Sequence, residues 1–105
     1  MTKITFIRNG DIIIGFSCKG HSGYAAFGAD IVCAAVSSAA ELCEITLTNV
    51  LNIPCRITSN AENAEYSLIL PGLFENAQPI LKGLLLYFAE LAAEYKKYIK
   101  LTEEI

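Results

Sequence analysis

The single histidine of the chain and one of its four cysteines could form a catalytic pair. His21 lies in a glycine-containing segment, and Cys33 follows near the start of a predicted helix. A cysteine thiolate attacks carbonyl carbons, and a neighbouring imidazole can take the thiol proton and later pass it to a leaving amine. These residue types predict nucleophilic catalysis by Cys33, with His21 as general base and acid.

The start of the predicted helix favours a reactive thiol. Asp30 is the expected N-cap, because its carboxylate can accept backbone N–H groups of the first turn, in which Cys33 lies. The positive end of the helix dipole favours thiolate there and lowers the thiol pKa. Backbone N–H groups of this turn are also expected to bind the oxyanion of a tetrahedral intermediate. Ser37, one turn further on the same face, and Asp30 are predicted as supporting residues.

The segment from residue 19 to 29 is too rich in glycine for a regular element and is predicted to be a mobile loop over the site. Its glycines are either simple turn formers or hinges of a lid. Its aromatic residues are either half-exposed or grip apolar substrate side chains. The predicted substrate loop consists of Gly20, Ser22, Gly23, Tyr24, Phe27 and Gly28.

Each candidate residue also has an ordinary structural explanation. A cysteine in an alanine-rich helix is usually a small core residue, and a lone histidine in a loop is usually solvated. Spacing alone leaves both explanations open, because cysteine and histidine pairs have no local signature that transfers between families. A redox-sensing role for Cys33 is a further alternative, but it lacks an obvious resolving cysteine, and Cys18 is the only nearby candidate in sequence.

Cys18 and His21 have a C-x2-H spacing, which raises the alternative of a zinc site. No paired cysteine motif follows, since Cys43 falls on a predicted core stripe and Cys55 begins a predicted strand. No metal and no other cofactor is expected.

The elements that must position these residues follow from the hydrophobic pattern. Residues 3–7 and 12–18 read as strands around an Asn9-Gly10-Asp11 turn, and residues 55–59 and 65–70 as two more strands. Residues 30–51 have helical periodicity, and a final helix begins near Pro79 with a core stripe that extends to Ile99. The predicted fold is a two-layer α+β domain in the order ββαββα, with two helices on a four-stranded, mainly antiparallel sheet.

The length, net charge and hydrophobic pattern of the chain restrict the classes of partner that it can have. A chain of 105 residues with a formal net charge of -3 predicts one domain, residues 1–105, and no direct binding of nucleic acid. The apolar stretch Ile80 to Ala93 is too short to span a bilayer, and residues 1–6 do not read as a secretory signal. A cytoplasmic protein without a membrane segment is expected. Apolar residues on the outer side of the final helix raise the prospect of a homodimer.

The sequence resembles the ribosomal-processing cysteine protease family, known as Prp, in two blocks at residues 20–24 and 28–37. They read Gly20-His21-Ser22-Gly23-Tyr24 and Gly28-Ala29-Asp30-Ile31-Val32-Cys33-Ala34-Ala35-Val36-Ser37. The chain departs from the family at Ser22, where alanine is frequent, and at Lys96, where proline is common.

The resemblance implies a thiol endopeptidase that removes a short N-terminal extension from a bacterial large-subunit ribosomal protein, at a site preceded by aromatic residues. It also implies a homodimer and a flexible loop over the site. The family's catalytic histidine and cysteine map onto His21 and Cys33, and Asp30 and Ser37 match residues near them. The alternative from another class is a non-catalytic, ribosome-associated module that binds a peptide without cleaving it.

Overall fold

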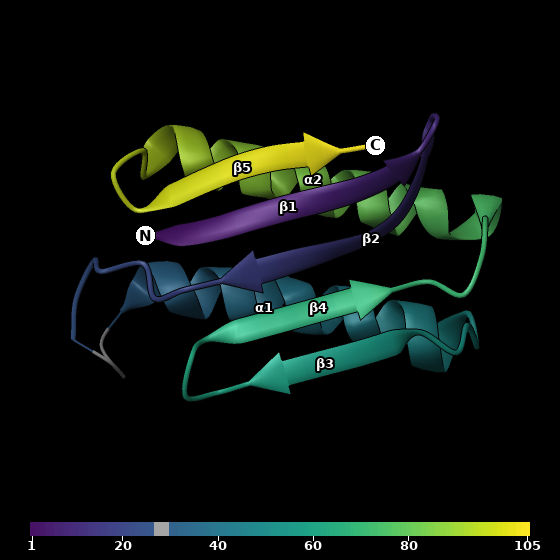
Figure 1. Ribbon diagram of the computed structural model, residues 1–105, viewed down its shortest axis with the longest axis horizontal. Coiled ribbons are helices and arrows are strands. Elements are labelled where there is room, and N and C mark those ends of the chain that lie inside the picture. The colour runs from purple at the N-terminus through teal and green to yellow at the C-terminus, as the bar shows by residue number, and fades with distance from the viewer. Residues whose placement is uncertain (27–29) are drawn as a thin grey trace.

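The computed structural model describes residues 1–26 and 30–105, which form one sheet with two long helices. The elements in chain order are β1 (Thr2–Asn9), β2 (Ile12–Lys19), α1 (Ile31–Ile45), the π-helix η1 (Thr46–Val50), β3 (Arg56–Asn60), β4 (Glu65–Ile69), the 3-10 helix η2 (Glu75–Ala77), α2 (Gln78–Glu94) and β5 (Ile99–Glu104). Both long helices lie on the same face of the sheet (Figure 1).

The sheet has five strands in the order β3-β4-β2-β1-β5. The β1–β2, β2–β4 and β3–β4 pairs are antiparallel, whereas β1 and β5 run parallel. The predicted first hairpin is confirmed: Gly10, between β1 and β2, has a φ of 63°, which glycine adopts without strain. The site described below lies where β2 ends and α1 begins.

The predicted four-stranded sheet and the order ββαββα are wrong at the C-terminal end. Helix α2 ends at Glu94 instead of extending to Ile99, and the chain then returns as the fifth strand, β5, beside β1. Ile99 is buried in the sheet at 3% exposure, so it contributes to the core as part of a strand. The short stretch Ile99 to Glu104 alternates between apolar and polar residues, which fits a strand with one buried face.

The core lies between the sheet and the two helices. Phe6 and Phe16 stack with ring centroids 5.5 Å apart, and Phe88 of α2 meets both rings edge-on. From α1 the buried residues are Val32, Val36, Ala40 and Cys43. The predicted α1 stripe therefore holds in part. Leu47 continues the buried stripe into the π-helix, whereas Val50 at the end of this turn, still within the predicted helical range, is 66% exposed.

Helix α1 with its π-helical extension, Ile31–Val50, is long and apolar enough to cross a membrane by length and composition. One such helix is weak evidence, because a core helix of a soluble protein passes the same test. Here Val32, Val36 and Leu47 are packed in the core.

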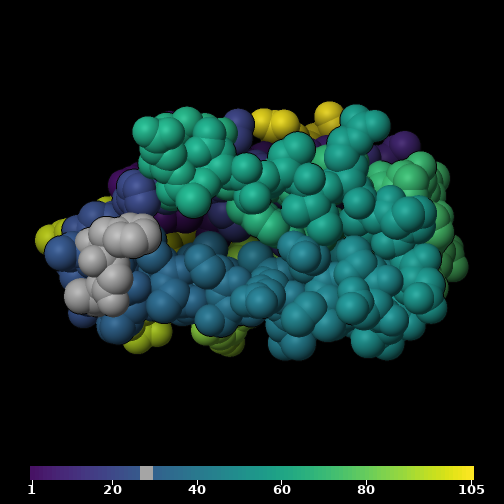
Figure 2. Space-filling view, turned by 90° about the horizontal axis from the view of Figure 1, so that it is seen from below, coloured from purple at the N-terminus to yellow at the C-terminus, as the bar shows by residue number. Residues whose placement is uncertain are grey.

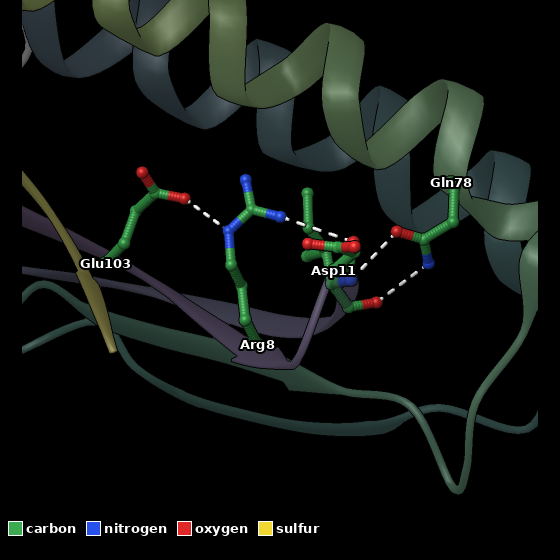
Figure 3. Close-up of polar contacts among 5 residues, drawn as sticks. Arg8, Asp11, Gln78 and Glu103 are labelled. Carbon is green, nitrogen blue, oxygen red and sulfur yellow. Dashed lines mark hydrogen bonds and ion pairs between the residues drawn. The ribbon is translucent and has the colours of Figure 1, made fainter. Parts of the chain in front are cut away.

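Gln78 of α2 forms hydrogen bonds with the start of β2, where β4 no longer pairs with this strand. The β2–β4 pairing reaches only to Gly15, and beyond it Ile13 bonds to the Gln78 amide: the Ile13 N–H donates to Oε1 at 2.8 Å, and Nε2 donates to the Ile13 carbonyl at 2.9 Å. Figure 3 shows this pair next to Arg8, whose guanidinium bonds Glu103 of β5. Gln78 is buried, so these bonds fix α2 to the sheet.

Replacing Gln78 by alanine is expected to lower the free energy of unfolding by about 2 kcal/mol, because the buried backbone groups of Ile13 lose their partners. Urea unfolding measures the effect. Glu90→Ala, on the exposed side of the same helix, is the control and is expected to change stability by less than about 0.5 kcal/mol. Equal stabilities of the two variants would contradict this role of Gln78.

Candidate active site

Asp30 caps α1, as predicted from the sequence. Its Oδ1 accepts the backbone N–H groups of Val32 and Cys33, each at 3.0 Å, and its carbonyl accepts the N–H of Ala34 at 3.1 Å. Cys33 therefore lies in the first turn of α1, and its side chain is half-buried. The thiol thus lies at the positive end of the helix dipole.

The same bonds contradict the expectation that backbone N–H groups of the first turn of α1 bind the oxyanion. The N–H groups of Val32, Cys33 and Ala34 all donate to Asp30, so they do not point unpaired into the site. Asp30, the N-cap that places the thiol in the first turn, also accepts the backbone N–H groups that lie nearest to it. The backbone N–H of Ser22 instead points at the nucleophile, since it donates to Cys33 Sγ at 3.4 Å.

The segment that carries His21 is anchored at Gly20, through both backbone polar groups of that residue. The Gly20 N–H donates to the carbonyl of Ala64 at 2.9 Å, and the Thr2 hydroxyl donates to the Gly20 carbonyl at 3.0 Å. Gly20 has a φ of 92°, and a Cβ there would lie 2.7 Å from the carbonyl oxygen of Met1. Only glycine fits this position without strain. This anchoring sets where the chain enters the loop, directly before the exposed His21.

Ser22 is buried beneath the loop at 2% exposure. Its hydroxyl donates to Oδ2 of Asp30 and accepts the N–H of Tyr24 at 3.2 Å. Burial alone would raise the pKa of Asp30, but the hydrogen bonds from the Ser22 hydroxyl and from Cys33 outweigh it and lower the pKa from 3.8 to about 2. Asp30 is therefore a carboxylate at every pH at which a cysteine protease works.

The lowered pKa of Asp30 predicts an acid-dependent loss of stability. Because the folded-state pKa is the lower one, the stabilisation is complete above about pH 4 and disappears as the pH falls to about 2. Asp30→Asn keeps a capping oxygen but has no charge to titrate. We expect it to be less stable than the parent near neutral pH, with the two melting temperatures converging towards pH 2. Melting curves that fall in parallel would contradict this role of Asp30.

A cavity of about 670 Å³ brings most of the predicted site together. His21 and Cys33 both line it, as do the predicted supporting residues Asp30 and Ser37. The substrate-loop residues Gly20 and Gly23 also line it. Figure 2 views this side of the molecule, where the surface is hollowed between α1 and the β3–β4 hairpin. The pairing of His21 with Cys33 therefore stands as a prediction that the geometry allows.

The other predicted loop residues lie elsewhere. Ser22 is buried under the cavity wall, and Phe27 and Gly28 fall outside the described residues. Tyr24 packs edge-on against Tyr95 and Tyr98, with ring centroids 5.7 and 5.2 Å away. Its ring attaches the loop to the turn that follows α2, which is a structural contact that the sequence did not indicate.

The opposite wall of the cavity was missed by sequence reasoning. It comes from the β3–β4 hairpin and consists of Ser59, Asn60, Ala61, Ala64, Glu65 and Tyr66. The Tyr66 hydroxyl donates to Glu44 of α1 at 2.7 Å, and burial followed by this carboxylate raises the Tyr66 pKa. This bond joins the hairpin to the helix that carries Cys33. No local motif marks these residues, since the strand pairing alone brings them to the site.

The remaining cysteines differ from Cys33 in their surroundings. Burial raises the pKa of Cys18 and Cys43 to about 12, so both stay protonated near neutral pH. Cys18 lines the same cavity as Cys33, and all four cysteines are free thiols. Across residues 1–26 and 30–105, no three His, Cys, Asp or Glu side chains are grouped as a metal ion would require.

Known proteins share this fold. The S. aureus ribosomal processing protease Prp, in complex with a covalently linked product peptide, matches with a TM-score of 0.92 at 20% identity, over 99% of this chain and 100% of that one. The same protease with a substrate peptide matches with a TM-score of 0.83 at 18% identity, over 99% and 100% of the two chains. A Streptococcus mutans protein matches with a TM-score of 0.86 at 24% identity, over 99% and 94%.

At these identities the solved structures establish the fold. The comparison with curated proteins found no significant relative. The family model of the cysteine protease Prp, however, matches residues 1–100, which is nearly the whole chain. The two sequence blocks around His21 and Cys33 lie inside this match and meet at one cavity. The chain therefore belongs to the Prp family of cysteine proteases.

Proposed function

We propose that this chain is a thiol endopeptidase that removes a short N-terminal extension from a bacterial large-subunit ribosomal protein. Family membership supports the protease class. The fold is shared with a protein described as a ribosomal processing protease, solved with a substrate peptide. The observation that carries the proposal is the position of Cys33 in the first turn of α1, with an N–H donor on its sulfur, in the cavity that His21 also lines.

In the proposed reaction, Cys33 Sγ attacks the scissile carbonyl carbon, and the new C–S bond gives a tetrahedral oxyanion. His21 holds the thiol proton and transfers it to the amine nitrogen as the C–N bond breaks. Water then attacks the thioester, its proton passes through His21 to sulfur, and the peptide leaves as a carboxylic acid. Asp30 and Ser37 support this chemistry from the cavity wall, and Asp30 does so by capping α1.

The β3–β4 hairpin and α1 flank the cavity, so an extended peptide chain can lie between them and reach Cys33. Gly20 is anchored and Ser22 is buried, so the residues of the predicted substrate loop that are proposed to close over that peptide are Gly23 and Tyr24.

The experiment is mass spectrometry of a peptide from the source organism's own extended ribosomal protein, before and after incubation with the protein. A single cut that releases the N-terminal extension supports the proposal. Binding of the peptide with no cut would instead support the non-catalytic peptide-binding module. Cleavage that does not depend on the extension would refute the assigned substrate.

We also propose a cytoplasmic homodimer. Apolar side chains remain exposed on the outer faces of α1 and α2, among them Leu42 at 62% and Leu86 at 67%. A groove of about 380 Å³ runs between the two helices and is lined almost entirely by apolar residues, including Leu42, Ile80 and Tyr87. Such a face favours association with a second copy. Sedimentation at micromolar concentration tests this, and a monomer alone would exclude the dimer.

A further inference from the structure

Ser22 lies directly after His21, yet it is one of the most buried polar residues of the chain, at 2% exposure. Its hydroxyl uses both of its hydrogen-bonding roles, because it donates to Oδ2 of Asp30 and accepts the N–H of Tyr24. A buried hydroxyl with both roles filled holds its own backbone in one place. Ser22 therefore fixes the chain next to His21 from below.

Ser22, Asp30 and Cys33 form a closed ring of hydrogen bonds around the nucleophile. The Ser22 hydroxyl donates to one oxygen of Asp30, and the other oxygen accepts the Cys33 N–H at 3.0 Å. The ring closes where the Ser22 N–H donates to Cys33 Sγ at 3.4 Å. One carboxylate thus ties the loop to the helix start, and the loop presents a donor to the sulfur.

The glycines on either side of this segment explain why it needs the hydrogen bond between Ser22 and Asp30. Gly20 and Gly23 flank the segment with φ values of 92° and 78°, so the backbone on both sides is of the most flexible type. Without the hydroxyl, the buried Oδ2 of Asp30 would lose a donor close to a developing thiolate. An uncompensated negative charge there disfavours ionisation of the Cys33 thiol.

We propose that Ser22 is a positioning residue: by binding Asp30, its hydroxyl holds the Ser22 N–H on Cys33 Sγ and holds His21 at the cavity wall. The proposal rests on the proposed function only for the roles of His21 and Cys33. It is particular to this chain, since a residue without a hydroxyl at this position cannot make the bond to Asp30.

The test compares Ser22→Ala with the control Thr102→Ala, which removes an exposed hydroxyl from β5. Iodoacetamide labelling of Cys33, read at that residue by peptide mass spectrometry, is followed from pH 5 to 10. For Ser22→Ala we expect labelling at pH 7 to slow by about fivefold, with its midpoint at a higher pH, as expected for a lost hydrogen bond near a charge. Thr102→Ala should keep the parental profile.

Peptide cleavage gives a second reading. Ser22→Ala should lower kcat by about tenfold and change KM by less than about threefold, because the hydroxyl acts on the catalytic groups and not on the peptide. Since Ser22 acts through Asp30, the Ser22→Ala, Asp30→Asn double variant should cleave no more slowly than Asp30→Asn alone. Additive losses would overturn the proposal.

A folded Ser22→Ala variant with a parental labelling profile would also overturn it, whatever happens to its stability. If the Ser22→Ala variant melts below the assay temperature, Ser22→Thr is tested in its place, because threonine keeps the hydroxyl. A parental labelling profile of Ser22→Thr supports the proposal, and a shifted profile refutes it. Labelling needs no substrate, so a parent that cleaves no peptide would refute the proposed function alone.

Discussion

Replacing Cys33 by alanine is expected to abolish cleavage of the extended ribosomal peptide, with a loss of at least about a thousandfold in kcat. The methyl group of alanine cannot form the thioester, and no other thiol takes over. Cys18 and Cys43 are buried with pKa values raised to about 12, and Cys55 does not line the cavity. Mass spectrometry of the peptide at fixed times measures the loss.

Cys55→Ala is the matched control for this prediction. Cys55 is a half-buried free thiol, as Cys33 is, but it precedes β3. It should cleave at the parental rate. Parental cleavage by Cys33→Ala would show that the nucleophile is another residue, whereas equal losses in both variants would show that the activity follows thiol content or stability.

Replacing His21 by alanine is expected to lower kcat by at least about a hundredfold, the usual contribution of a positioned general acid and base. In the proposed mechanism, the leaving amine would lose its proton donor, and the Cys33 thiol would lose the base that takes its proton. Labelling of Cys33 by iodoacetamide near neutral pH should therefore slow as well. The two readings, cleavage and labelling, should fall together.

Lys19→Ala is the control, since Lys19 is an exposed neighbour in the same segment that does not line the cavity. It should leave both cleavage and labelling unchanged. Slow cleavage with parental labelling in His21→Ala would mean that the histidine serves the leaving group without activating the thiol. Parental values of both would exclude His21 from the reaction.

The parts of the site that were predictable from the sequence are local ones. Asp30 lies three residues before Cys33, and this spacing alone makes an N-cap and a first-turn cysteine when a helix follows. The first hairpin was equally local, because Asn9-Gly10-Asp11 favours a tight turn wherever it occurs. The second of the two blocks that resemble the Prp family, residues 28–37, contains this cap, so the resemblance and the candidate site depend on the same local residues.

The parts that could not be predicted depend on contacts between distant segments. The strand β5 pairs with β1, almost the whole chain away, and its short alternating stretch was hidden by a helical stripe that continued through Tyr95. The β3–β4 wall of the cavity reaches Cys33 through sheet order alone. The burial of Ser22 could not be predicted for the same reason, since a serine in a glycine-rich loop is usually exposed.

The parallel pairing of β1 with β5 determines when the sheet can be completed during translation. Thr2 donates its N–H to the Tyr98 carbonyl and its hydroxyl to the Gly20 carbonyl, so the first strand ties the segment just before β5 to the entry of the His21 loop. During translation, β1 emerges early but keeps an unpaired edge until residues 99–104 have been synthesised. The nascent chain therefore completes the sheet that anchors the entry of the His21 loop only after residues 99–104 have emerged.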